Sequence, residues 1–429
     1  MSKKVKIGII SGIIAVILAI VTFASGFFIA RDYYLTKEMQ TLKFILDNYH
    51  KYYYYQEDDV SHLVANGILD DYSAYYTKEE YEIIEKASQG YKNTTGIAPT
   101  KDLEILKVLF NSPADLAGIK SGGKIVKVNS QPVASIQDFK QKAVGTYSLT
   151  INYNGTEVEY PNLKAKEFKE TFVRFYDSNY EYSFLGIDSI ALNKKSSIGL
   201  IEESIPSDTL YIKYTGFSGV GNGDLNSWQN NLNTSVGQFN YAMQFYKQNN
   251  KRKLILDLRD NGGGYLSILR CIASHFIHSS STENPLVMYT KTKDGKVENY
   301  YSLKTKKLLY NFSNITILAN KNTASASESL IGAMLEYDSP GIVRVVVENN
   351  NGVYTSYGKG VVQDTIVDRI NGQAIKLTIA VSFWPVTNIC IHGKGISKAI
   401  SRYSSQIYES KNGETDIDAL KYAIQFLNN

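Results

Sequence analysis

The chain contains little cysteine and little histidine. Only two cysteines, Cys271 and Cys390, occur among its 429 residues, together with five histidines. Two distant cysteines leave one disulfide open, but they provide neither a disulfide framework nor a CxxC metal motif. Only His275 and His278 are close enough to share a helical face, and without an acidic third ligand nearby they do not favour a metal site. We therefore expect neither a metal nor a cofactor.

An excess of charge of either sign is also missing. The 46 lysines and arginines nearly balance the 42 aspartates and glutamates, which gives a formal net charge of +4. A nucleic-acid-binding protein usually carries a strongly basic patch, so we expect no nucleic-acid partner. The apolar share of 43% and the charged share of 21% are those of a globular protein, and the length allows two or three domains.

One apolar run is long. No charged residue lies between Ile7 and Ala30, and a helix of that length would extend about 36 Å, which is enough to cross a bilayer. Three lysines precede the run, and the positive-inside rule then keeps the N-terminus in the cytoplasm. We expect residues 1–31 to form a cytoplasmic stub and a single transmembrane helix that anchors the catalytic domain on the extracytoplasmic side of the cell membrane. A signal peptide cleaved near residues 24–26 is the alternative.

The pattern changes twice after the apolar run. Residues 32–89 are predicted to be a helical N-terminal region, since their apolar residues follow a helical spacing and Thr77 fits the start of a capping box. Residues 90–165 change to short strands. Residues 166–429 alternate strands with helices, including a helical stretch expected over about Asn226–Lys247. This alternation predicts an α/β core.

The short-strand region contains clear local signals. Asn154-Gly155 is typical of a two-residue hairpin turn, here between strands predicted over Tyr147–Tyr153 and Thr156–Tyr160. Ser135 predicts the start of a short helix. These elements indicate a small β-rich domain in front of the α/β core.

A glycine-rich stretch follows a strand predicted over Leu254–Leu258. It contains Gly262, Gly263 and Gly264 and leads into a helical pattern from Tyr265, so bare backbone amides would face a ligand at the start of a helix. A dinucleotide-binding fingerprint needs a further glycine at position 267, which is a serine, and the Gly-Lys-Ser/Thr of a P-loop is missing. The mismatch argues against nucleotide binding.

A second stretch presents a serine. Ser325 lies between a strand predicted over Ile315–Ala319 and a helical pattern over Ser329–Tyr337. A strand, a tight turn and a helix expose a serine hydroxyl and the next backbone amide, as acyl transfer requires. Ser325 with Glu328 also fits a helix capping box. The stretch alone therefore leaves a nucleophile and an ordinary helix start both open.

A third stretch presents a lysine. Lys359 lies between Gly358 and Gly360, and Gln363 follows four positions later. A lone Gly-Lys-Gly is usually a solvated loop. A free lysine has a pKa near 10.4, so burial must lower that pKa by about three units before the amine can take a serine proton at neutral pH. A neutral glutamine can orient such an amine without adding a negative charge that would raise its pKa again.

Taken together and in this order, the three stretches resemble the catalytic set of the C-terminal processing (tail-specific) serine proteases. The resemblance implies a ClpP- or crotonase-like α/β core, with Ser325 as the nucleophile, Lys359 as the general base and Gln363 as the residue that orients the base. The interval from Ser325 to Lys359 is longer than is usual in the family. We expect the extra residues, around Val345–Ser356, to form an inserted hairpin.

The resemblance also implies oxyanion donors and a peptide-binding domain. The donors would be the amide of Ala326 and a glycine amide at Gly262 or Gly263. Asn111–Pro132 resembles the corresponding part of PDZ domains in these proteases, which implies a PDZ domain over residues 90–165. A PDZ domain adds a peptide tail to a sheet edge and holds its carboxylate with backbone amides. The residues expected to bind the tail are Gly96, Ile97 and Ala98.

These features predict a membrane-anchored serine endopeptidase, a hydrolase of the C-terminal processing type. Its PDZ domain would capture the exposed C-terminal tail of a protein or peptide substrate, and Ser325 would cleave an upstream peptide bond through an acyl-enzyme. The alternatives are a catalytically idle PDZ-containing membrane scaffold that binds peptide C-termini, and a crotonase-like acyl-CoA enzyme. The natural substrate, the direction of PDZ control and the formation of a homo-oligomer stay open.

Overall fold

The structure is a computed structural model, and it describes residues 60–184, 190–194, 205–219, 224–279, 281–303, 312–338, 341–347, 356–409 and 416–428, with residue 310 and scattered positions between 16 and 46. The chain divides into two compact units, residues 1–68 and 69–429. The first contains α3 (Val60–Ile68). Within the described residues, no helix has the length and apolar character needed to span a bilayer. Most of the anchor predicted over residues 1–31 lies outside the described positions, so the anchor stays a prediction.

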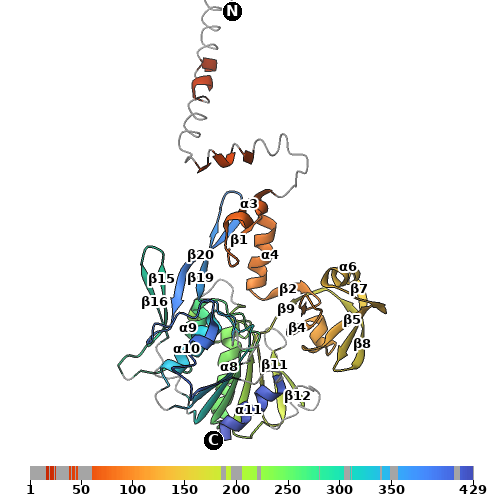
Figure 1. The fold of residues 1–429 in the computed structure, drawn as a ribbon, viewed down its shortest axis with the longest axis vertical. Helices are drawn as coiled ribbons and strands as arrows, with labels where there is room; N and C mark the ends of the chain where they lie inside the picture. Colours follow the sequence, from red (N-terminus) through yellow and green to blue (C-terminus); the bar gives the residue numbers. More distant parts are fainter. Residues whose placement is uncertain are drawn as a thin grey trace, which may run out of the picture. The chain divides into compact units, whose positions relative to one another are not determined.

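A mixed eight-stranded sheet forms the centre of the second unit (Figure 1). Its strand order is β12-β11-β10-β13-β14-β17-β18-β21, with parallel pairing from β13 to β21 and antiparallel pairing from β12 to β13. The strands are β10 (Val173–Tyr176), β11 (Tyr180–Phe184), β12 (Ile190–Lys194), β13 (Thr209–Tyr214), β14 (Lys253–Asp257), β17 (Asn314–Ala319), β18 (Val343–Val347) and β21 (Ile407–Glu409). Helices connect the parallel strands, and this confirms the predicted α/β core.

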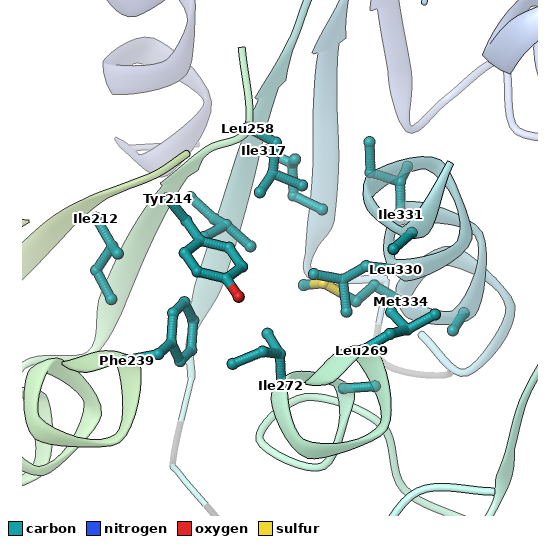
Figure 2. Packing of buried hydrophobic residues seen from close by; sticks show 14 of the residues in the cluster. Ile212, Tyr214, Phe239, Leu258, Leu269, Ile272, Ile317, Leu330, Ile331 and Met334 are labelled. Carbon is teal, nitrogen blue, oxygen red and sulfur yellow. The ribbon is translucent and has the colours of Figure 1, made fainter. Parts of the chain in front are cut away.

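Helices cover both faces of this sheet. They are α8 (Ser235–Gln248), α9 (Leu266–Ala273), α10 (Ala326–Glu336) and α11 (Asp416–Asn428). Successive side chains of a strand point to opposite faces: Leu254 and Leu256 pack with α8, α9 and α10, whereas Ile255 packs with Leu420 of α11. Figure 2 shows part of the first cluster, where Leu330 of α10 lies among strand and helix side chains. Each fully buried side chain of this kind contributes about 1.5–3 kcal/mol, and burial on both faces explains the unbroken apolar run of β14.

The helical stretch predicted over Asn226–Lys247 is confirmed, but it is interrupted, because the chain forms two helices there. A turn separates α7 (Leu225–Gln229) from α8. Thr234 caps α8, and its hydroxyl oxygen accepts a hydrogen bond from the amide of Gly237 at 3.0 Å. A Cβ at Gly237 would lie 2.1 Å from the carbonyl oxygen of Asn231. The break thus depends on a cap and a close backbone approach, neither of which a hydrophobic spacing reveals.

A second sheet joins early and late parts of the chain. It contains β1 (Ala74–Tyr76), β15 (Leu286–Thr292), β16 (Val297–Tyr301), β19 (Val361–Val367) and β20 (Ala374–Phe383). The prediction that residues 32–89 are helical is confirmed in α4 (Lys78–Ser88), where Thr77 forms the expected capping box. It is wrong at β1, which pairs antiparallel with β20, with Tyr75 opposite Ile375. No local pattern shows a partner so late in the sequence.

The short-strand region has a core of its own. Its sheet has the order β6-β5-β7-β8, and β3 pairs with β4 beside it. The elements are β3 (Ile97–Pro99), β4 (Ile105–Val108), α5 (Pro113–Leu116), β5 (Lys124–Val128), β6 (Gln131–Pro132), α6 (Ile136–Lys142), β7 (Thr146–Tyr153) and β8 (Thr156–Lys164). Ile125 and Leu149 are buried in this core. The predicted hairpin is confirmed, since Asn154 and Gly155 have φ of 51° and 96°, as a type I′ turn requires. Ser135 caps α6 as expected.

The cysteines and one histidine are parts of the folded framework. Cys271 and Cys390 are both free, so no disulfide joins them. His275 is buried with its Nε2 atom 2.7 Å from Asn240 Oδ1, and burial lowers its pKa to about 3. The imidazole is therefore neutral at ordinary pH. Within the described residues, no group of three His, Cys, Asp or Glu side chains could hold a metal ion.

A tight contact in α10 yields a stability prediction. A Cβ at Gly332 would lie 2.2 Å from Cε2 of the buried Trp384 indole. We predict that Gly332→Ala lowers the free energy of unfolding by about 1–3 kcal/mol, because overpacking outweighs the better helix propensity of alanine. Urea unfolding followed by circular dichroism measures this change. Gly67→Ala is the control, since Gly67 lies in α3 with no atom within 4 Å of an added Cβ. A Gly332→Ala protein as stable as the wild type would contradict the prediction.

Candidate active site

Ser325 lies between β17 and α10, as the N-cap residue of that helix. Its backbone has φ 57° and ψ −117°, a conformation that residues with a side chain rarely adopt and that costs about 1–3 kcal/mol. Surrounding contacts must therefore impose it. The helix begins at Ala326, earlier than the predicted start at Ser329. The amide of Ala326 is thus one of the first helical amides, which have no partner inside the helix.

The turn that carries Ser325 is tied to the end of the neighbouring strand. β14 and β17 are parallel neighbours, so their carboxyl ends meet at one edge of the sheet. The amide of Ala324 and the hydroxyl of Ser327 both donate to the carbonyl oxygen of Asn261, each at 3.0 Å. Asn261 also donates its side-chain amide to the carbonyl oxygen of Tyr214 at 2.9 Å. These bonds hold the serine turn against the glycine-rich stretch.

The glycine-rich stretch lies directly on the serine turn. A Cβ at Gly263 would lie 2.8 Å from both Ala326 N and Ser325 Cβ, and the φ of Gly263 is +90°, so only glycine fits. The amide of Gly263 donates to Asn261 Oδ1 at 3.0 Å. In the part of the chain that is described, the amides of Gly262 and Ala326 have no acceptor. Of the two glycine amides predicted as oxyanion donors, Gly262 is therefore the better candidate.

A buried charged cluster supports the strand that leads into this stretch. Asp257, at the end of β14, pairs with Arg259 at 2.7 Å and with Lys213 at 3.2 Å, and it accepts a hydrogen bond from the hydroxyl of Tyr211. Burial alone would raise the pKa of Asp257, but the charges of Arg259 and Lys213 hold it well below its usual range. The carboxylate therefore stays ionised and fixes the backbone just before the glycines.

The loop that carries Lys359 depends on the glycines on either side of the lysine. A Cβ at Gly358 would lie 2.7 Å from Gly395 N, and one at Gly360 would lie 2.7 Å from His392 N. The late segment that contains Gly395 therefore packs directly on this loop, which leads into β19 of the second sheet. Close backbone contact explains why both neighbours of the lysine are glycines.

The side chain of Lys359 is half-buried, with charged neighbours of both signs. Burial lowers its pKa and the positive charge of Lys376 lowers it further, while Asp70 and Glu328 oppose this change. Its Nζ atom lies 5.5 Å from the ring centroid of Tyr72, and such a cation–π contact favours the charged form. The net direction, a lowered pKa, is the one expected of a general base.

A single buried carboxylate joins the two candidate residues. Oε2 of Glu328 accepts hydrogen bonds from the amide of Ser325 at 2.8 Å and from the amide of Lys359 at 3.0 Å. Because both nitrogens contact one oxygen, they lie within about 6 Å of each other. The structure thus brings together a serine that follows a strand of the first sheet and a lysine that precedes a strand of the second.

Gln363 lies on β19 beyond Lys359. Its Nε2 atom donates to Thr378 Oγ1 at 3.1 Å, and among the described contacts it makes no hydrogen bond to Lys359. The orienting role of Gln363 stays a prediction. The insertion expected around Val345–Ser356 falls mainly on residues 348–355, which are outside the described positions.

The predicted tail-binding residues lie in the short-strand region. Gly96 has φ +89°, and a Cβ there would lie 2.1 Å from Ser112, which caps α5. Ile97 and Ala98 belong to β3, which among the described strands pairs only with β4. One edge of β3 is therefore without a strand partner. No hydrogen bond within the described chain links these residues to the serine turn.

Sequence reasoning missed three contributors to the site. The sequence predicts Glu328 only as a capping-box partner and Ser356 only as the end of an insertion, and it indicates no role for Tyr72. Ser356 donates its hydroxyl to Glu328 Oε1 at 2.6 Å and accepts the amide of Ile396 at 2.8 Å. The ring of Tyr72 contacts His392 edge-on, with the ring centroids 6.0 Å apart. The late segment Ile391–Ile396 contains two glycines, but its sequence does not show which residues it contacts.

Comparison with known proteins shows which proteins this site is similar to. The family model of Peptidase family S41 matches residues 208–401, which contain all three predicted catalytic residues. The chain is 27% identical over 300 residues to the carboxy-terminal processing protease CtpB of Bacillus subtilis, and 27% identical over 318 residues to CtpA of the same organism. These matches cover 69% and 74% of this chain but 52% and 57% of the relatives. The chain thus spans about half the length of the curated relatives it matches.

A solved structure is similar as well. The photosystem II D1 C-terminal processing protease matches with 16% identity and a TM-score of 0.46, over 84% of this chain and 82% of that chain. The family match and the sequence relatives agree: residues 208–401 are similar to peptidase family S41, and the chain is similar to the carboxy-terminal processing proteases.

Proposed function

We propose that the chain is a serine endopeptidase that hydrolyses peptide bonds with a dyad of Ser325 and Lys359. The observation that carries the proposal is the shared hydrogen bonding of their two backbone amides to Glu328. The lowered pKa of Lys359 and the match of residues 208–401 to a peptidase family support it. The activity requires no metal.

The chemistry begins with a proton transfer. The neutral amine of Lys359 takes the proton of Ser325 Oγ as this oxygen bonds to the carbonyl carbon of the substrate. The amides of Ala326 and Gly262 stabilise the negative charge on the carbonyl oxygen. When the C–N bond breaks, the leaving amine receives the proton from Lys359. Lys359 then takes a proton from water as the water oxygen bonds to the acyl carbon, and it returns this proton to Ser325 Oγ as the ester bond breaks and the carboxylic acid, which ionises, is released.

The proposal includes recognition of C-terminal tails by residues 90–165 as a PDZ domain. The unpaired edge of β3 supports it, since an extended peptide can add there as a further strand. The positive φ of Gly96 supports a tight loop before this strand, where backbone amides can hold a carboxylate. The proposal also includes a single-pass membrane anchor over residues 1–31 and a catalytic domain on the extracytoplasmic side. The apolar run in the sequence is the only support for this part.

The dyad is tested by two substitutions. We predict that Ser325→Ala and Lys359→Ala each lower the cleavage rate of dye-labelled casein at least ~10³-fold, as loss of a nucleophile or its base does in serine proteases. The full chain in mild detergent is assayed, and circular dichroism checks folding. Lys291→Ala, an exposed lysine on β15, is the control. Wild-type turnover in a folded Lys359→Ala protein would refute the dyad.

The pH dependence follows from the charges around Lys359. The rate requires neutral Lys359, so activity should rise with pH through the pKa of this lysine. The charge of Lys376 lowers that pKa. We therefore predict that Lys376→Gln raises it and moves the acidic limb of kcat/KM to higher pH, while Lys291→Gln leaves the limb in place. A limb that stays in place or moves to lower pH in Lys376→Gln argues against Lys359 as the base.

Tail recognition is tested by binding. We predict that the full-length Ser325→Ala protein binds a peptide with an apolar C-terminal residue and a free carboxylate at least ~10-fold more tightly than the same peptide with a C-terminal amide, because hydrogen bonds to a charged group are worth about 1.5–3 kcal/mol. Fluorescence anisotropy measures both affinities. Equal affinities for the two peptides would remove the PDZ domain from the proposal and leave residues 90–165 a structural role.

A further inference from the structure

Glu328 lies at the junction of the serine turn and the lysine loop and is fully buried. Its two oxygens accept four hydrogen bonds. Oε1 accepts from Ser356 Oγ at 2.6 Å and from Gly358 N at 2.8 Å, and Oε2 accepts from Ser325 N at 2.8 Å and from Lys359 N at 3.0 Å. The acceptor capacity of a carboxylate is thus filled entirely by groups of the candidate site.

A helix cap alone does not account for this arrangement. The glutamate of a capping box needs only to return to the N-cap amide, as Glu328 does to Ser325, and Glu80 does the same for Thr77 in α4 without being buried. A fully buried carboxylate costs several kcal/mol unless its hydrogen bonds are satisfied. Here the three further donors all come from residues 356–359. The buried carboxylate therefore joins two segments that the sequence separates.

The two segments carry the two partners of the proton transfer. The contacts to Ser325 and Lys359 use one and the same oxygen, so a shift of this oxygen moves the backbone of both residues. Ser325 is held at a positive φ, and the bond from its amide to Glu328 is one of the contacts that impose this conformation. Displacement of a reacting group by about 1 Å can cost ~10²-fold in rate.

From these contacts we infer that Glu328 is a positioning residue, which sets the distance between the nucleophile and its base by holding both backbone amides on one carboxylate. The inference rests on the proposed function, because it assigns a purpose to the contact only if Ser325 and Lys359 act together. Glu328 acts through these two residues and does not itself touch the substrate.

The charges around Glu328 define a second readout. Lys359, from the lysine loop, and Tyr72, from the segment before β1, interact electrostatically with Glu328, while Asp70 and Lys376 act on Lys359 itself. Burial raises the pKa of Glu328, and its four hydrogen bonds and the N-terminus of α10 favour the ionised form. The negative charge of Glu328 in turn raises the pKa of Lys359. Loss of this charge should therefore move the acidic limb of the pH profile of kcat/KM to lower pH.

The test compares two glutamates of the same helix. Glu328→Gln keeps the shape but replaces one acceptor oxygen with a donor. Glu336→Gln is the matched control, since Glu336 also lies on α10 and also accepts backbone amides, in its case two, from Val386 at 2.6 Å and Thr387 at 3.0 Å. For Glu328→Gln in the full chain we expect a ~10²-fold loss of kcat with KM within about threefold, and an acidic limb at lower pH. Glu336→Gln should keep the wild-type kcat and the wild-type acidic limb of the pH profile.

Hydrogen exchange gives a readout that does not depend on turnover. Mass spectrometry of peptides that cover residues 323–328 and 356–360 should show faster amide exchange in both segments in Glu328→Gln, and in neither segment in Glu336→Gln. If Glu328→Gln does not fold, Glu328→Asp serves instead, which keeps the charge and shortens the reach. In Glu328→Asp, kcat should fall while the acidic limb of the pH profile stays in place.

The outcomes separate the inference from the proposed function. A folded Glu328→Gln protein with wild-type kcat, wild-type limb and unchanged exchange overturns the inference and leaves the proposed dyad intact. Absence of cleavage by the wild type, with faster exchange of both segments in Glu328→Gln, overturns the proposed function and, with it, the positioning role, while the structural bridge stands.

Discussion

The site depends on one buried carboxylate that two sheets share. Strand β17 of the central sheet leads into the serine turn, the lysine loop leads into strand β19 of the second sheet, and the side chain of Glu328 accepts backbone amides from both. An unpaired negative charge in this position would cost several kcal/mol, so the donors must remain in place for the fold to be stable. The hydrogen bonds that make the burial of Glu328 tolerable are therefore the same bonds that hold Ser325 and Lys359 close together.

Further contacts hold the serine turn and the lysine loop in place. Asn261 accepts two donors from the serine turn through its carbonyl oxygen, and the ionised Asp257 cluster fixes the backbone just before it. On the other side, Gly358 and Gly360 pack on the backbone of a late segment. Each candidate residue is thus held by backbone contacts, so that the two side chains have only their own torsions left to adjust. Such preorganisation is what a proton transfer between Ser325 and Lys359 needs.

The sequence predicted those features that local chemistry decides. The hairpin turn at Asn154, the cap at Thr77 and the strand-turn-helix around Ser325 each depend on neighbouring residues, and each is observed. The pairing of β1 with β20 and the role of Glu328 depend on residues far apart in the chain. In the sequence, Glu328 is an ordinary capping residue, and nothing local shows that residues 356–359 will meet it. The break before Thr234 was missed for a similar reason, because a close backbone contact leaves no periodic pattern.

Reaction with a fluorophosphonate, which forms a stable adduct only with an activated serine, tests the central claim most directly. Intact-mass and peptide mass spectrometry of the full chain should show one phosphonyl group, attached to Ser325, with a rate of labelling that increases as Lys359 loses its proton. An unlabelled Ser325 across the whole pH range, in a protein that is folded, would contradict the claim that the bridged serine and lysine form a working pair.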